Sequence, residues 1–257
     1  MQLNITIIQA DIVWEDKEAN LRQYESFING IQDKKEVVAL PEMFSTGFSM
    51  NKETLAESMD GATVKWMKNI AKEHRCILTG SLIIEDGSNY YNRMLWVQPD
   101  GVIYHYDKRH LFAYADEHNH YTPGEKRLIV SVKGFKICLM VCYDLRFPVW
   151  SRVKEEEYDV LLYIANWPER RNLAWKTLLQ ARAIENQCYC IGVNRVGLDG
   201  KGLNYSGDSA VYGPLGEKLY EVSGTVVAHT ITLEKELVEN TRSHLPFLKD
   251  ADDFMIL

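Results

Sequence analysis

The sequence lacks the long apolar run that a membrane-spanning helix requires. Such a helix needs roughly 18–20 consecutive apolar residues, and no stretch of the 257 residues approaches this length. It also lacks an excess of basic residues: 29 Lys and Arg stand against 36 Asp and Glu, for a formal net charge of -7. Nucleic-acid-binding domains usually carry a basic patch. We therefore expect no membrane and no nucleic-acid partner.

The five cysteines include no CxxC pair. An odd number of cysteines without such a pair suits a reducing compartment better than a disulfide scaffold. The first residues, MQLNITIIQA, also lack the basic segment of a signal peptide. These features predict a cytoplasmic protein.

Apolar patterning predicts an α/β protein without an internal boundary. Strand-like apolar segments occur at 3–9, 37–40, 76–84, 91–97, 102–107, 128–132, 135–141, 160–165, 189–193, 209–212, 218–222 and 225–231. Helical spacing marks 21–31, 64–71 and 175–184, and a short helix is expected at 148–153. No repeat, linker or low-complexity tract separates these segments. We expect residues 1–257 to form one domain whose sheets are covered by helices.

Three apolar runs each end in one reactive residue: VVALP in Glu42, VIYHYD in Lys108 and KICLMV in Cys142. In open α/β sheets, ligands bind outside the carboxyl ends of the strands. We therefore expect these three side chains to meet in one pocket. A carboxylate, an ammonium and a thiol are the groups that acyl transfer through a thioester requires.

Cys142 differs in its position from the other cysteines. A free cysteine within a strand usually behaves as a small buried hydrophobe, and Cys138, Cys188 and Cys190 fit this description. Cys142 instead follows a strand, where the chain turns toward a helix. A helix N-terminus favours the thiolate, and an abrupt turn exposes a nucleophile. The position therefore predicts a nucleophile.

Glu42 and Lys108 each have an ordinary alternative. A lone glutamate after a proline is usually a surface residue, but the apolar neighbours of Glu42 favour a partly desolvated general base. Lysines at strand ends are commonly solvated, and Lys108 alone predicts nothing. Beside a thiol and a carboxylate, its ammonium and the backbone N–H of Tyr143 are suited to stabilise an oxyanion.

The polar stretch 109–127 has no periodicity, and a loop of this length in a compact domain is usually functional or mobile. Its segment Asp-Glu-His-Asn-His at 116–120 raises the alternative of a metal site. Metal ligands normally sit on regular elements with supporting contacts, so we expect no metal. A Cys–His dyad with one of these histidines stays open, although no spacing supports it.

Three further residues are candidates for substrate binding. Trp167 ends a strand and suits a pocket wall and a core position equally well. Arg146 is able to bind a substrate carboxylate through two hydrogen bonds, although a structural pairing with Asp144 or Glu185 is favoured. Phe44, next to the predicted base, completes the set.

Several segments resemble a known family. Residues 40–43 (LPEM), 106–108 (YDK) and 142–148 (CYDLRFP) resemble, in order and separation, the three signature segments of the nitrilase superfamily of carbon–nitrogen hydrolases. The resemblance extends through 181–186 and 207–209, and so across essentially the whole chain.

This resemblance implies an α-β-β-α sandwich that dimerises through helices and works without a metal or organic cofactor. It also implies that Glu117 is a second active-site glutamate. Residues 108–118 and 165–168 resemble the ω-amidase branch, which hydrolyses the side amide of 2-oxoglutaramate or 2-oxosuccinamate. The expected partner is thus a small-molecule amide. The alternatives are hydrolysis of N-carbamoyl amino acids or nitriles, and a binding protein without catalytic activity.

Overall fold

The computed structural model describes residues 1–255. The strands are β1 (Gln2–Gln9), β2 (Val37–Ala39), β3 (Ile77–Asp86), β4 (Asn89–Val97), β5 (Ile103–Asp107), β6 (Leu128–Val132), β7 (Phe135–Val141), β8 (Val160–Ile164), β9 (Tyr189–Val193), β10 (Val196–Leu198), β11 (Asn204–Tyr212), β12 (Lys218–Ser223) and β13 (Val227–Glu234). The α-helices are α1 (Lys17–Gly30), α2 (Lys52–Leu55), α3 (Ala62–His74), α4 (Pro148–Ser151), α5 (Asn172–Asn186) and α6 (Lys235–His244).

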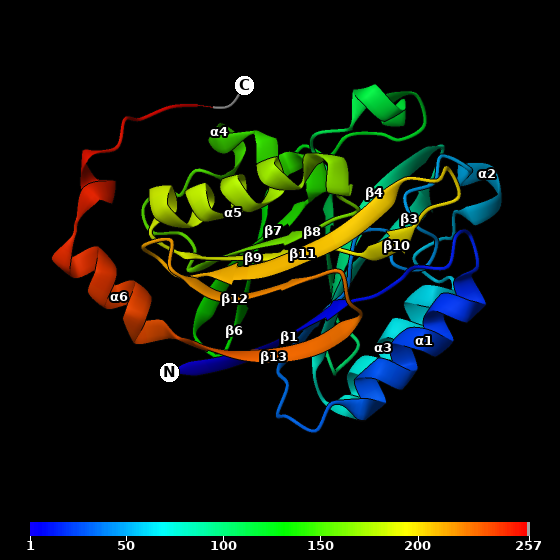
Figure 1. Ribbon diagram of the computed structural model, residues 1–257, viewed down its shortest axis with the longest axis horizontal. Coiled ribbons are helices and arrows are strands. Elements are labelled where there is room, and N and C mark those ends of the chain that lie inside the picture. Colours follow the sequence, from blue (N-terminus) through cyan, green and yellow to red (C-terminus); the bar gives the residue numbers. More distant parts are fainter. Residues whose placement is uncertain (256–257) are drawn as a thin grey trace.

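The strands form two sheets. The first has six strands in the order β13-β1-β2-β3-β4-β5, and the second has seven, in the order β10-β11-β9-β8-β7-β6 with β12 paired to β11. Helices α1 and α3 cover the outer side of the first sheet, and α5 lies over the second (Figure 1). The predicted α-β-β-α sandwich is confirmed.

Alternation along the strands separates the two sides of the first sheet. Leu3, Ile5 and Ile7 of β1 belong to the core that joins the two sheets, whereas Ile8 packs with α1 and α3. In β2 the same alternation places Ala39 in the core between the sheets. Both faces of β2 are buried, and its sequence Val-Val-Ala accordingly reads as a continuous apolar run.

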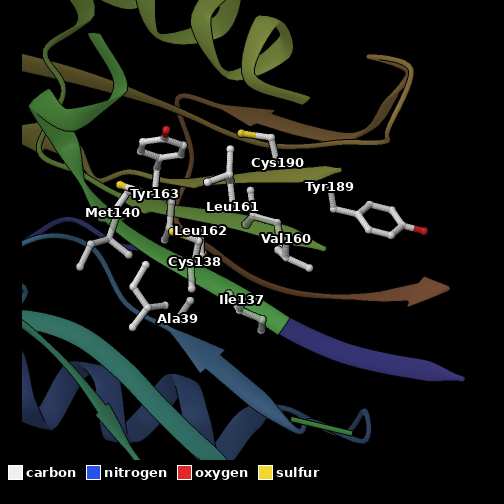
Figure 2. Packing of buried hydrophobic residues seen from close by; sticks show 14 of the residues in the cluster. Ala39, Ile137, Cys138, Met140, Val160, Leu161, Leu162, Tyr163, Tyr189 and Cys190 are labelled. Carbon is white, nitrogen blue, oxygen red and sulfur yellow. The ribbon is translucent and has the colours of Figure 1, made fainter. Parts of the chain in front are cut away.

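The second sheet is buried on both faces as well. Figure 2 shows residues of β7, β8 and β9 packed together, with Ala39 of the opposite sheet nearby. Leu161, Tyr163 and Cys190 lie on the side that faces α5 (Figure 2). Burial of apolar surface is the dominant favourable contribution to folding, and this double core provides it on both faces of each sheet.

Most predicted elements are present at nearly the predicted positions. The hairpin β6–β7 has the predicted bounds, and its turn residues Lys133 and Gly134 both adopt positive φ, as a two-residue hairpin turn requires. Helices α2 and α6 and strand β10 were not predicted. Within residues 1–255, no helix combines the length and the apolar character needed to cross a bilayer.

Candidate active site

The three reactive residues come from the ends of strands in two different sheets. Glu42 follows β2 and Lys108 follows β5 of the first sheet, whereas Cys142 directly follows β7 of the second. The expected convergence therefore occurs, and it brings together strand ends from both sheets. The site lies where strand ends of the two facing sheets come together.

Lys108 joins two carboxylates. Its Nζ lies 2.9 Å from Oε1 of Glu42, and 3.0 and 2.9 Å from Oε1 and Oε2 of Glu117. All three side chains are fully buried. Burial by itself lowers the pKa of Lys108, but the charges of Glu117 and Glu42 outweigh it and raise the pKa above its ordinary value. The ammonium is therefore charged throughout the physiological range.

Burial has the opposite effect on the second glutamate. It raises the pKa of Glu117, an effect that Lys108 opposes and Glu42 reinforces. Two carboxylates that share one ammonium repel each other, so one of them binds a proton more readily than an isolated carboxyl group. The arrangement is suited to accepting and returning a proton.

Two asparagines that the sequence reasoning missed hold these carboxylates. Nδ2 of Asn92 on β4 donates to Oε1 of Glu42 at 2.7 Å and to Oε1 of Glu117 at 3.3 Å. The backbone N–H of Asn166 donates to Oε2 of Glu42 at 2.8 Å, and its side chain donates to the carbonyl of Glu42. Asn92 stands next to Arg93 in β4, and no local sequence pattern distinguishes it as a site residue.

Cys142 occupies a sharp turn. Its φ is +46°, a left-handed conformation that residues other than glycine rarely adopt. Such strain is often retained at functional sites. The residue begins a 3₁₀ turn (Cys142–Arg146) rather than an α-helix, and its side chain borders a cavity while being 8% exposed.

The expectation that the turn at Cys142 favours the thiolate is wrong. Burial raises the pKa of the Cys142 thiol well above its ordinary value, and the charge of Glu42 adds to this effect. The five-residue 3₁₀ turn offers no long helix dipole to compensate. The resting residue is therefore a neutral thiol, which needs a base when it reacts.

Asp144 ties the cysteine turn to the segment around Lys108. Its Oδ2 accepts from the N–H of Val141 at 3.0 Å and from the hydroxyl of Tyr106 at 2.7 Å. Its Oδ1 accepts from the N–H of His110 at 3.0 Å and lies 2.8 Å from Nδ1 of the same residue. This carboxylate fixes the relative positions of two chain segments that belong to different sheets. It also binds the backbone N–H and the ring of His110.

The loop 109–127 turns one acidic residue inward. Glu117 is fully buried, whereas Asp116 and His118 are exposed and His120 is partly exposed. The N–H of Gly124 donates to the carbonyl of Lys108 at 2.9 Å, so the loop closes onto the site. Among residues 1–255, no three His, Cys, Asp or Glu side chains are grouped closely enough to hold a metal ion.

A cavity of about 230 Å³ opens over the thiol. This volume is below the ~300–1,000 Å³ of drug-sized pockets and suits a small substrate. Tyr143, Trp167 and Arg146 line it with Cys142. Glu42 and Lys108 lie close enough to the thiol for their charges to act on its pKa, which Glu42 raises and Lys108 lowers. Trp167 also packs on Trp175, with ring centres 5.5 Å apart, so both of its predicted positions apply.

Two of the substrate-binding expectations need correction. Phe44 does not border the cavity; it is buried on the outer side of the first sheet, 5.4 Å from the ring of Tyr24, and Phe48 lines the cavity instead. Arg146 does not pair with Asp144 or Glu185. The carboxylate of Asp144 is occupied, Glu185 pairs with Arg182, and Arg146 is exposed with its guanidinium carbon 5.1 Å from the centre of the Trp167 ring.

A four-layer sandwich that brings a thiol, an ammonium and two carboxylates together is typical of a hydrolase that works through a covalent thioester. Residues 4–235 match the family model described as carbon-nitrogen hydrolase, and the chain belongs to this family. The resemblance seen in its signature segments is thereby confirmed.

Two curated proteins and one solved structure are similar to this chain over most of its length. The chain is 45% identical to "Omega-amidase YafV" of Escherichia coli K12, over 99% of this chain and 98% of the relative. It is 34% identical to "2-oxoglutaramate amidase" of Bacillus subtilis 168, over 86% of each chain. A solved CN-hydrolase superfamily protein, XC1258 of Xanthomonas campestris, is 40% identical with a TM-score of 0.96 and carries an arsenic adduct in its active site. The match covers 100% of this chain and 99% of that structure.

Proposed function

We propose that the protein is an amidase of the ω-amidase type, which hydrolyses the terminal amide of a small 2-oxo acid such as 2-oxoglutaramate and releases ammonia. The observation that carries this proposal is the buried Glu42–Lys108–Glu117 cluster whose charges act on a strained, cavity-lining Cys142. The curated relatives named ω-amidase and 2-oxoglutaramate amidase support the choice of substrate.

The first half-reaction forms a thioester. The sulfur of Cys142 attacks the amide carbon, and Glu42 takes the thiol proton. A base is needed because the thiol is neutral at rest. Glu42 then gives this proton to the nitrogen, the carbon–nitrogen bond breaks, and ammonia leaves.

The second half-reaction uses the same groups. Water attacks the thioester carbon and gives one proton to Glu42, the sulfur–carbon bond breaks, and the returning proton regenerates the thiol. The product leaves as the carboxylic acid, which gives its remaining proton to solvent and becomes a carboxylate. Lys108 and the backbone N–H of Tyr143 stabilise the oxyanion in both halves; loss of one such donor typically lowers the rate about 100- to 1,000-fold. Glu117 holds Lys108 in position through two short contacts.

The proposal extends to the molecule as a whole. Residues 1–257 act as one hydrolase domain without a cofactor, and the protein forms a homodimer through its helices. Leu173 and Ile184 of α5 are 77% and 50% exposed, and such apolar side chains are suited to a subunit interface. Five free cysteines are consistent with a cytoplasmic location.

Parallel ammonia-release assays on the purified protein test the substrate. We expect 2-oxoglutaramate to be hydrolysed with a kcat/KM far above that of an N-carbamoyl amino acid or a nitrile. A higher kcat/KM for either of these two would replace the proposed reaction with another one of the superfamily. Absence of turnover with all three, together with a Cys142 that does not react with iodoacetamide, would favour a binding protein without catalytic activity.

A further inference from the structure

The cavity above Cys142 carries an excess of positive charge. Four of its lining residues are cationic: Arg146, Arg170, Arg171 and Lys201. Its only acidic lining residue is Asp199, and that carboxylate already accepts hydrogen bonds from the Tyr205 hydroxyl and from two backbone N–H groups of its own turn. In a chain of net charge -7, this local excess marks a place for an anion.

None of the four cations is neutralised by the protein. No ion pair between residues 1 and 255 involves any of them. Two buried arginines elsewhere in the fold each have a carboxylate partner, Asp107 for Arg93 and Asp11 for Arg195. The four cations around this cavity have none in the described part of the chain, so their charges are available to a ligand.

Arg171 is the most constrained of the four. It is half-buried at the end of the 3₁₀ turn Glu169–Arg171, and its guanidinium carbon lies 5.0 Å from the centre of the Phe112 ring. Its carbonyl accepts a hydrogen bond of 2.8 Å from Nε1 of Trp167. Both its backbone and its side chain are thus held against aromatic walls of the cavity. A side chain fixed in this way loses little freedom when it binds a ligand.

The surroundings of Arg171 favour an incoming anion. Burial lowers the pKa of Arg171, and the charges of Arg170 and Arg146 lower it further. A bound carboxylate relieves this repulsion and accepts two parallel hydrogen bonds from a guanidinium. Arg146 lies over the Trp167 ring of the same cavity, and the indole N–H of Trp167 donates to the carbonyl of Arg171, so both arginines contact Trp167.

We propose that Arg171 is a specificity-determining residue which, together with Arg146, binds the carboxylate of the substrate at the end opposite to the amide. This inference rests on the proposed amidase function. It makes the protein selective for amides of small dicarboxylic acids over neutral amides of the same length.

The kinetic test compares glutaramate, which is an anion, with its neutral methyl ester. In Arg171→Gln, kcat/KM for glutaramate is expected to fall roughly 10- to 100-fold, as loss of a charged hydrogen-bond partner predicts. The value for the neutral ester should change by less than about twofold, since a purely structural role would affect both substrates. Arg171→Lys keeps the charge without the planar fork and should recover part of the loss. An equal fall for both substrates would overturn the proposal.

A binding test does not depend on turnover. Glutarate should protect Cys142 from iodoacetamide, and in Arg171→Gln the concentration for half-protection should rise roughly 10- to 100-fold. Arg75→Gln removes the same charge from the exposed end of α3 and should leave protection unchanged. Unchanged protection in Arg171→Gln would overturn the carboxylate site. If no amide is hydrolysed but protection is lost in Arg171→Gln, the amidase function fails while the carboxylate site stands.

Discussion

Nζ of Lys108 lies 2.9 Å from Oε1 of Glu42, although the strands that carry these residues, β5 and β2, are separated in the sheet by β3 and β4. Asn92 of β4 contacts the same carboxylate oxygen from the intervening strand. The contact is possible because Glu42 and Lys108 both lie beyond the ends of their strands. This buried pair accounts for several measurable properties.

Replacement of the ammonium should destabilise the fold in a pH-dependent way. Lys108→Met leaves Glu42 and Glu117 buried without a cation, and breaking a buried ion pair typically costs about 3–5 kcal/mol. In the variant, the folded-state pKa of at least one carboxyl rises further above its unfolded value. The folded state then binds the extra proton, and stability falls as pH rises through that window. Chemical denaturation should show a larger loss at pH 7.5 than at pH 5.

The matched control is Lys65→Met on the exposed side of α3. We expect its free energy of unfolding to change by less than about 0.5 kcal/mol at both pH values, as is usual for surface substitutions. An identical loss at pH 5 and pH 7.5 in Lys108→Met would show that the two carboxylates do not take up a proton when the ammonium is removed.

Glu42→Gln should separate the two effects of this carboxylate on Cys142. The variant loses the base, and ammonia release is expected to fall about 100- to 10,000-fold. It also loses a negative charge that raises the thiol pKa, so the thiol should ionise at lower pH than in the wild type. A pH titration of thiolate absorbance measures the second effect. A burst of ammonia followed by a stalled thioester would show that another group performs the first proton transfer.

The pH profile of alkylation reports the environment of Cys142 in the unmodified protein. Because burial and Glu42 raise the thiol pKa, the thiolate fraction near pH 8.5 should be well below that of a free thiol, whose pKa is about 8.5. The rate with iodoacetamide should therefore keep rising at a pH where a free thiol has reached its plateau. A plateau below pH 8 would contradict the raised pKa.

Asn92→Leu tests a residue that touches both carboxylates but not the cavity. The leucine side chain is similar in size to asparagine but donates no hydrogen bond to Glu42 or Glu117. We expect kcat to fall about tenfold or more, in line with the loss of hydrogen bonds to charged groups, with little change in KM. Asn89→Ala, at the exposed start of the same strand, should leave both constants unchanged. A change confined to KM would indicate a role in substrate binding.

Local signals in the sequence account for much of the fold. The turn residues Lys133 and Gly134 define the β6–β7 hairpin, and the continuous apolar run before Cys142 defines a strand buried on both faces. Helix α6 was missed because Leu237 and Val238 are its only large apolar residues. Strand β10 is three residues long and is formed by its pairing with β11.

Only the site residues that follow a strand or belong to a signature segment could be predicted from the sequence. Glu42, Lys108 and Cys142 each follow an apolar run, and that pattern is visible in one dimension. The position of Asn92 between Glu42 and Glu117 depends on the strand order β2-β3-β4-β5, which no local pattern reveals. Which phenylalanine lines the cavity likewise depends on the turn after Glu42, where Met43 adopts positive φ: Phe48 lines it and Phe44 does not.

The most direct test of the account is the Cys142→Ala variant assayed for ammonia release from 2-oxoglutaramate. Removal of the nucleophile should lower turnover by about 10⁴-fold or more, while the circular dichroism spectrum and the unfolding midpoint stay close to the wild type. Turnover at the wild-type rate in a folded Cys142→Ala protein would contradict the assignment of this sulfur as the attacking atom.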